Sequence, residues 1–198
     1  MTDEPLSDAA QASLKKHAAD PVVLAPHHSA WGEQFKELAE KMKAVCGDRL
    51  VTIHHIGSTS VPGLAAKPLI DMMPELRHHD DGPGLAPLLE PLGFVYFGAY
   101  GIDGRHFFRR KGGVDVNVHM FETGHIEIER HVVFRDALRA DAQLLSAYQE
   151  LKEGLAARFP NDVDSYALSK SDFIEGILRD LGAPERPRSL EGLGGPDN

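Results

Sequence analysis

The stretch "HHIGSTSVPGLAAKPLIDMM", residues 54–73, decides how this chain is interpreted. It holds the end of one strand-like run, "LVTIHHI", and a second run, "KPLIDMM", while the Pro-Gly pair between them breaks any long helix. A Gly-Ser pair follows the first run, and twelve residues separate Ser58 from Asp71. The stretch therefore predicts two neighbouring strands of one mixed sheet, joined by a turn that carries polar groups.

The turn itself has two interpretations. A strand that ends in Gly57, Ser58 and Thr59 presents backbone N–H groups and two hydroxyls at a sharp bend. Such a bend binds phosphate well, because no side chain blocks close approach. The alternative is a plain turn, and a lone Gly-Ser pair is a weak signal.

Asp71 lies inside an apolar run, where a carboxylate is costly unless it is paired or bound to a metal. The alternative is an aspartate at the exposed end of a strand. Met73 is on the same face of the predicted strand, where a two-metal site would need a second carboxylate. Any further metal ligand must therefore come from elsewhere in the chain.

The segment "RHFFRRKGGVDVNVHM" predicts a hairpin with a two-residue Gly-Gly loop. Pairing of residue 110 with 115 and of 106 with 119 would place four polar side chains on one face: His106, Arg110, Asp115 and His119. This face either contributes ligands to a site or is the solvated face of an edge strand. If it contributes, Asp115 would hold Mg²⁺ together with Asp71, and His119 would be a general base.

Basic side chains cluster along the chain in a way that suits an anion. Lys67 precedes Asp71 by four residues, and Arg109 lies in an arginine-rich run whose side chains match phosphate geometry. Lys170 lies beside the apolar face of a predicted C-terminal helix, so we expect its amine to reach the rim of the pocket and meet an anion. For any single one of these residues, a solvated surface cation is the alternative.

Composition limits the class of protein. The 198 residues suit one domain, and acids outnumber bases thirty to twenty-one, for a net charge of −9. That balance argues against non-specific nucleic-acid binding. The single Cys46 allows no intrachain disulfide. No run of eighteen apolar residues exists and the start lacks a secretory signal, so we expect no membrane span and a cytoplasmic location.

The order of the predicted elements gives the fold class. Residues 1–20 predict a flexible extension, 21–182 the domain, and 183–198 a disordered tail rich in proline and glycine. The pattern from Glu127 to Leu181 is helical, with Asp141 as a helix N-cap. We therefore predict an α+β fold, in which helices flank a mixed sheet and further helices follow at the C-terminal end.

The sequence resembles the GrpB family over about residues 22 to 180. The most specific match is "HIGSTSVPGLAAKPLID", which is nearly the family signature, and five shorter matches are spread over the domain: "AWGEQFKEL", "YGIDGRHFFRRKG", "ERHVVFRDALR", "LAARFP" and "SKSDFIEGIL". The resemblance implies the nucleotidyltransferase superfold that is shared with DNA polymerase beta. In that superfold Gly57 and Ser58 match the residues that hold nucleotide phosphates, and Asp71 matches a magnesium ligand.

The sequence departs from the superfold or the family at two positions. Met73 stands where the superfold has a second carboxylate, although the family itself usually has an apolar residue there. The strand that is often His-His-x-His in the family reads Val-Asn-Val-His here, so only His119 matches.

Two functions remain open at this point. One is Mg²⁺-dependent transfer of a nucleotidyl group from a nucleoside triphosphate to an acceptor, with a small-molecule nucleotide as the partner. The other is a non-catalytic nucleotide-binding, anion-binding or chaperone-like module. Since the family occurs fused to dephospho-coenzyme A kinase, the resemblance also implies a link to coenzyme A synthesis.

Overall fold

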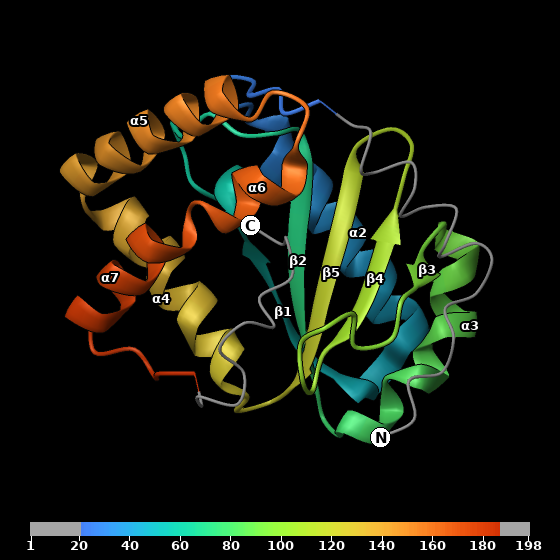
Figure 1. Cartoon of the computed structure of the whole chain (residues 1–198). Helices are drawn as coiled ribbons and strands as arrows, with labels where there is room; N and C mark the ends of the chain where they lie inside the picture. Colours follow the sequence, from blue (N-terminus) through green and yellow to red (C-terminus); the bar gives the residue numbers. More distant parts are fainter. Residues whose placement is uncertain (1–20, 187–198) are drawn as a thin grey trace.

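The computed structural model describes residues 21–186. Its centre is a five-stranded mixed sheet in the order β1-β2-β5-β4-β3 (Figure 1). The strands are β1 (Leu50–Ile56), β2 (Leu69–Leu76), β3 (Val95–Tyr96), β4 (His106–Arg110) and β5 (Asp115–Glu122). Strands β2 and β5 are parallel, and the other neighbours are antiparallel. The two runs of the opening stretch are adjacent strands of this sheet, as predicted.

Helices lie on both sides of the sheet. Helices α2 (Ala30–Cys46) and α3 (Ala86–Leu89) lie on one side. Four helices lie on the other side: α4 (Ile126–Ala140), α5 (Ala142–Arg158), α6 (Val163–Leu168) and α7 (Ser171–Asp180). The Asp141 carboxylate accepts hydrogen bonds from the backbone N–H groups of residues 143 and 144, so α5 begins at its predicted N-cap. The predicted α+β class is confirmed.

The two faces of the sheet differ in composition because side chains alternate along each strand. One face is mainly apolar, and Ile70, Met72 and Val118 pack there against α2 and α3. The opposite face carries Met73, which is fully buried in a cluster with Ile56 and residues of β5 and α4. Asp71 lies two residues before Met73, so its carboxylate is on the side of the C-terminal helices.

The C-terminal helices pack against the segment that connects β1 and β2. Val61 and Leu64 of this connection are fully buried against Tyr148 of α5 and against Ile174 and Leu178 of α7. The predicted packing of the C-terminal helices on the sheet domain is thus present, although Leu181, expected in the packed face, is half exposed. The Gly-Ser turn is therefore enclosed between the sheet and a helical layer.

The β4–β5 hairpin has a different register from the predicted one. Arg109 pairs with Asn117 and Phe107 with His119, which is one residue away from the predicted pairing. The reason is the loop: Arg110 pairs with Val116, so five residues, 111–115, lie between the paired positions, an odd number in place of the even number that a two-residue Gly-Gly turn requires. A one-residue slip turns a side chain to the other face. His106 and Arg110 consequently face α3, and the predicted face shared with His119 is wrong for both.

The ends of the chain are only partly described. The predicted extension, residues 1–20, and most of the predicted tail, residues 187–198, lie outside the described range. Residues 183–186, expected to begin the tail, instead make defined contacts: Ala183 is buried, and the carbonyl of Pro184 accepts a hydrogen bond from Arg130 of α4. Within residues 21–186, no helix combines the length and the apolar character needed to cross a membrane.

Candidate functional site

The turn after β1 brings the backbone directly against Asp71. Gly57 has a φ of 67°, and Ser58–Ser60 form one 3₁₀ turn. A Cβ atom on Gly57 would lie 2.3 Å from Oδ2 of Asp71, which is closer than any real contact. Glycine is thus required here both by the positive φ angle and by the carboxylate beside it.

Asp71 is held by neighbours on β5. Asn117 is its Cα partner across the parallel pair, and its Nδ2 donates to Oδ1 of Asp71 at 3.4 Å. His119 Nε2 lies 3.6 Å from the same oxygen, and His119 is only 3% exposed. The Oδ1 atom of Asn117 is buried and has no hydrogen-bond partner among the described residues. An oxygen of Asn117 therefore lies unsatisfied next to the carboxylate.

Three lysines converge on this carboxylate in a pocket that we call the Asp71 pocket. Its polar lining consists of Ser58, Thr59, Lys67, Asp71, Lys152, Tyr166 and Lys170. Lys152 of α5 and Lys170, just before α7, are each only 1% exposed. The ammonium groups of Lys170 and Lys67 lie 4.6 and 5.8 Å from the centre of the Tyr166 ring. One carboxylate thus faces three cations, two of which are withdrawn from water.

Burial changes the protonation of Lys152. Burial, followed by the nearby charge of Lys67, lowers the pKa of the Lys152 amine to about 7, and Asp71 opposes this shift. The amine donates to the backbone carbonyl of Ala65 and lies 5.5 Å from the Tyr148 ring centre. Sequence reasoning missed this lysine, although residues 148 and 155 of the same helix, one turn to either side, are buried and apolar.

Lys170 is placed more deeply than predicted. The expectation was an amine that reaches the rim of the pocket, but the side chain is almost fully enclosed and its ammonium is packed over the Tyr166 ring. A cation above an aromatic face is stabilised by the ring quadrupole, which offsets part of the loss of hydration. The lysine is therefore part of the pocket wall.

A second pocket opens at the start of β5, and we call it the β5 pocket. Its charged lining residues are Lys67, Arg109, Lys111 and Asp115, and its volume is about 380 Å³. Asp115 is on the same face of the sheet as Asp71, but its carboxylate accepts a hydrogen bond from Lys111 at 2.6 Å. Lys67 lines both pockets, so the two pockets are adjacent.

The predicted site residues are thus distributed over two pockets. The Asp71 pocket is lined by Ser58, Lys67 and Asp71, and the β5 pocket by Asp115. His119 lies beside the Asp71 carboxylate, with its Nε2 at 3.6 Å from Oδ1. Among residues 21–186, no group of three or more acidic, histidine or cysteine side chains is arranged to hold a metal ion.

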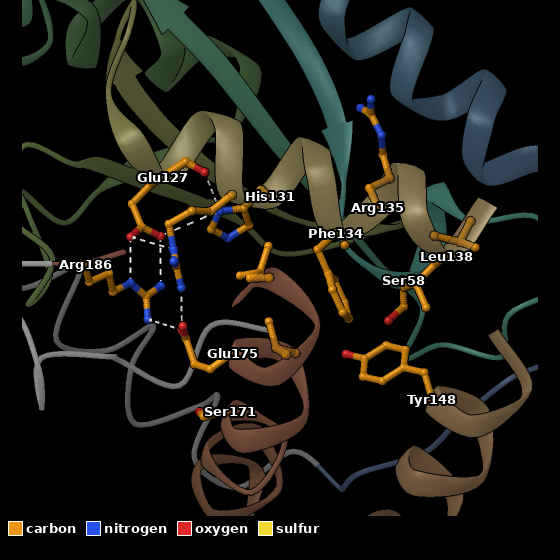
Figure 2. Close-up of a pocket in the computed structure, with 15 residues that line it drawn as sticks. Ser58, Glu127, His131, Phe134, Arg135, Leu138, Tyr148, Ser171, Glu175 and Arg186 are labelled. Atoms are coloured by element: carbon orange, nitrogen blue, oxygen red, sulfur yellow. Dashed lines mark hydrogen bonds and ion pairs between the residues drawn. The ribbon is translucent and has the colours of Figure 1, made fainter. Parts of the chain in front are cut away.

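A small cavity of about 60 Å³ lies on the far side of Ser58, between α4, α5 and α7 (Figure 2). The hydroxyl of Tyr148 faces Ser58, and burial raises the pKa of Tyr148 although a hydrogen bond with Ser58 opposes the shift. At the other end Arg186 binds Glu127 through two hydrogen bonds of 2.6 and 2.8 Å, and Arg130 binds Glu175. The charged groups at this end of the cavity are therefore paired with one another, although Nε of Arg130 has no hydrogen bond among the described residues and lies 3.7 Å from Glu127.

This charged network fixes residues 183–186 to α4. Burial raises the pKa of Glu127, but the hydrogen bonds from Arg186 and the charges of His131, Arg186 and Arg130 outweigh burial and lower it to about 2. The carboxylate is consequently ionised, and the network closes the helical layer over the Gly-Ser turn.

The architecture around the Asp71 pocket is that of the nucleotidyltransferase fold. Terminal uridylyl transferase 4 from Trypanosoma brucei with bound dUTP matches with a TM-score of 0.52 and 14% identity, over 92% of this chain and 61% of that one. The identity is low, so the match shows the fold alone.

The chain belongs to the GrpB family, whose model, described as "GrpB protein", matches residues 21–180. The crystal structure of conserved protein GrpB from Enterococcus faecalis matches with a TM-score of 0.74 and 35% identity, over 80% of this chain and 96% of that one. UPF0157 protein BH1888 from Halalkalibacterium halodurans is 32% identical over 92% of this chain and 93% of its own length.

Other relatives are longer than this chain. UPF0157 protein YqkA from Bacillus subtilis is 39% identical over 75% of this chain, but the match spans only 44% of that relative. A dephospho-CoA kinase from Mycolicibacterium paratuberculosis is 25% identical over 84% of this chain and 47% of its own length. The family thus includes proteins in which this domain is one part of a larger chain.

Proposed function

We propose that the Asp71 pocket binds the phosphate groups of a nucleoside triphosphate. The observation that carries the proposal is the convergence of Lys67, Lys152 and Lys170 on one carboxylate beside the Gly-Ser turn. A polyphosphate carries several negative charges, and three lysine side chains that line one pocket match such a ligand. The Gly-Ser turn beside them supplies hydrogen-bond donors for phosphate oxygens.

A single Mg²⁺ ion suits the donors beside the phosphates. Magnesium is commonly bound through one or two carboxylates while substrate phosphates and water supply the other oxygens. Asp71 offers a carboxylate, and Asn117 offers the buried oxygen that has no partner among the described residues. When bound, the ion supplies positive charge to phosphate oxygens. In this proposal His119 positions Asp71 rather than acting as a base, since it is buried beneath the carboxylate.

Nucleotidyl transfer to an acceptor is the second candidate function, and Lys152 favours it. Its pKa of about 7 leaves a large neutral fraction of the amine inside the pocket near neutral pH. A general base is most effective when its pKa lies near the working pH. In this role Lys152 would accept the proton of the attacking acceptor group, while Lys67 and Lys170 neutralise charge that develops on the phosphates. A Met73 side chain buried in an apolar cluster favours binding without transfer.

The binding proposal is tested by thermal shift of the full chain with ATP, GTP, CTP and UTP across a magnesium series. Asp71→Asn should abolish the additional stabilisation that magnesium gives, because the metal ligand is lost. Ser58→Ala should weaken nucleotide binding about equally with and without metal, by roughly 1 kcal/mol for a neutral hydrogen bond. A magnesium response that Asp71→Asn leaves unchanged would refute the metal site.

Asp115→Asn is the matched control for the aspartate change. Its carboxylate is engaged by Lys111, so the magnesium response should be retained. Loss of the response in both variants would instead support the pair of ligands, Asp71 and Asp115, that the sequence predicts. Mass spectrometry of the products after incubation with each nucleotide tests whether transfer occurs.

A further inference from the structure

The two oxygens of the Asp71 carboxylate have different surroundings. Oδ2 faces the Gly-Ser turn, because a Cβ atom on Gly57 would lie only 2.3 Å from it. Oδ1 faces β5, where Nδ2 of Asn117 lies at 3.4 Å and Nε2 of His119 at 3.6 Å. The carboxylate therefore directs Oδ2 toward a ligand at the turn while these two β5 side chains attract Oδ1.

The position of one hydrogen atom decides whether His119 attracts Oδ1. A neutral imidazole carries a hydrogen on one ring nitrogen and a lone pair on the other. With the hydrogen on Nε2, the ring presents a positive N–H group to the carboxylate; with the hydrogen on Nδ1, it presents a lone pair that repels the carboxylate. The 3.6 Å separation is too long for a hydrogen bond, so the contact is electrostatic and its sign depends on the tautomer.

Arg105, directly before β4, selects between the two tautomers. Its Nη1 lies 3.2 Å from Nδ1 of His119, and both side chains are buried. A guanidinium has N–H donors and no acceptor, so Nδ1 must accept and the hydrogen of the neutral ring must be on Nε2. The hydrogen bond made by one ring nitrogen is the usual determinant of what the other nitrogen can do.

The loop before β4 is built around this guanidinium. Nε of Arg105 donates to the carbonyl of Ala99 at 3.1 Å, and Nη2 donates to the carbonyl of Tyr100. Its Cζ lies 4.6 Å from the centre of the Phe107 ring. Within residues 21–186, Tyr100 is the one residue other than glycine with a positive φ angle, 44°. Such a backbone is strained and persists only where the surrounding structure imposes it, and here it belongs to the residue whose carbonyl holds Arg105.

We infer that Arg105 is a positioning residue for the Asp71 carboxylate and acts through the tautomer of His119. Arg105 is not one of the residues that line the Asp71 pocket, so its effect on a ligand there passes through His119. The inference rests on the proposed function for what Oδ2 of Asp71 binds, but not for the chain of contacts from Arg105 to Asp71.

The first measurement needs no ligand. Long-range proton–nitrogen correlation spectra of the isotope-labelled full chain distinguish a protonated from an unprotonated ring nitrogen, and comparison with His119→Gln assigns the signals of His119. In wild type Nε2 should carry the hydrogen and Nδ1 should not. In Arg105→Met, Nδ1 loses its donor, so His119 should become a mixture of tautomers. Arg105→Lys keeps a donor and should retain the wild-type signature.

The second measurement follows the stabilisation of the full chain by ATP across a magnesium series. Loss of a partner outside the ligand shell typically costs about 10–100-fold in metal affinity, so Arg105→Met should lower the apparent Mg²⁺ affinity about tenfold. Arg105→Lys should restore most of it. Arg110→Met is the matched control, because this nearby arginine lies over the Phe94 ring on the opposite face of the sheet, and it should change neither the tautomer nor the affinity.

The outcomes separate this inference from the proposed function. A wild-type His119 ring with its hydrogen on Nδ1 overturns the inference, even if Arg105→Met does not fold. A folded Arg105→Met in which the tautomer or the Mg²⁺ affinity is unchanged also overturns it. If wild type shows no magnesium-dependent nucleotide binding, the proposed function fails, and the ligand-free spectra still decide the chain of contacts. In that case Asp71→Asn should shift the Nε2 signal of His119 and leave Nδ1 unprotonated, and an unshifted signal overturns the inference.

Discussion

Replacing Lys152 by methionine probes the charge balance of the Asp71 pocket. The lysine side chain is 1% exposed, and burial together with the charge of Lys67 lowers its pKa from 10.5 to about 7. Methionine has a similar length and is apolar, so it can occupy the same space without a charge. The variant therefore removes the buried ammonium with little change in packing.

The sign of the effect follows from proton binding. Between pH 7 and 10.5 the unfolded chain binds more protons at Lys152 than the folded chain does, so the free energy of unfolding rises with pH in this window. The difference between 10.5 and about 7, at about 1.4 kcal/mol per pH unit, amounts to about 5 kcal/mol. That stability is complete above pH 10.5 and is lost as the pH falls through 7.

The methionine variant lacks this dependence, but it also leaves the carbonyl of Ala65 without its donor. A buried unsatisfied carbonyl costs about 1–3 kcal/mol at every pH. We therefore expect Lys152→Met to be about 2–4 kcal/mol more stable than wild type at pH 6. At pH 10 the lysine of the unfolded chain is still mostly protonated, so about 1 kcal/mol of the protonation penalty remains, and the variant should be about 0–2 kcal/mol less stable than wild type.

Urea unfolding of the full chain at pH 6, 8 and 10, in buffers without phosphate or other polyanions, measures this crossing. Lys36→Met, which removes an exposed lysine from α2, should alter stability little at either extreme. Stability curves of wild type and Lys152→Met that run parallel between pH 7 and 10 would refute the reasoning.

Two further substitutions test the turn and the network around the site. Gly57→Ala should destabilise the fold by more than about 2 kcal/mol and abolish nucleotide binding, since its φ angle is positive and the new Cβ would collide with Asp71. Gly63→Ala, with a similar φ angle and no atom within 4 Å, should show only the conformational cost of about 1–2 kcal/mol. Arg186→Gln should lower the free energy of unfolding at pH 7 by about 3 kcal/mol, because Glu127 keeps its buried charge but loses its bidentate partner. In wild type, ionised Glu127 stabilises the fold above its unfolded pKa of 4.5, and this stabilisation is lost as the pH falls to about 2. In Arg186→Gln the same loss should occur at a higher pH, which an acid titration of stability measures.

The sequence determines the strands of the fold better than their register. Alternation, β-branched residues and the Pro-Gly break identify β1, β2 and β5, because these signals are local. The β4–β5 register depends on how many residues form the loop, and the carboxylate of Asp115 stabilises the longer loop by binding Lys111 and the N–H of Gly112. No local signal reports such a contact, so the prediction for Arg110 was wrong.

The candidate site could be predicted where it depends on the turn and on β2. Ser58, Lys67, Asp71 and Lys170 were all selected from the sequence, and all of them line one pocket. Lys152 was not predicted, because it lies on a helix far along the chain from the Gly-Ser turn, and only tertiary packing brings the two together. An isolated lysine between buried positions of an amphipathic helix is the pattern that could have identified it.

The positive charge of the Asp71 pocket also offers a physical explanation for Met73 at the position where the superfold has a second carboxylate. With Lys67, Lys152 and Lys170 protonated, the Asp71 pocket carries a formal charge of +2 before any metal binds, so protein ammonium groups supply much of the charge that metals supply at a two-metal site. Nucleotide binding should therefore persist without magnesium. It should weaken as the pH rises through 7, where Lys152 loses its proton. Without metal, Asp71→Asn should bind nucleotide more tightly than wild type, because a negative charge that repels the phosphates is removed. Adding magnesium should not increase the nucleotide affinity of this variant further. Weaker nucleotide binding by this variant without metal would show that the Asp71 carboxylate does not face the phosphates. The three lysines would then not be explained by phosphate binding.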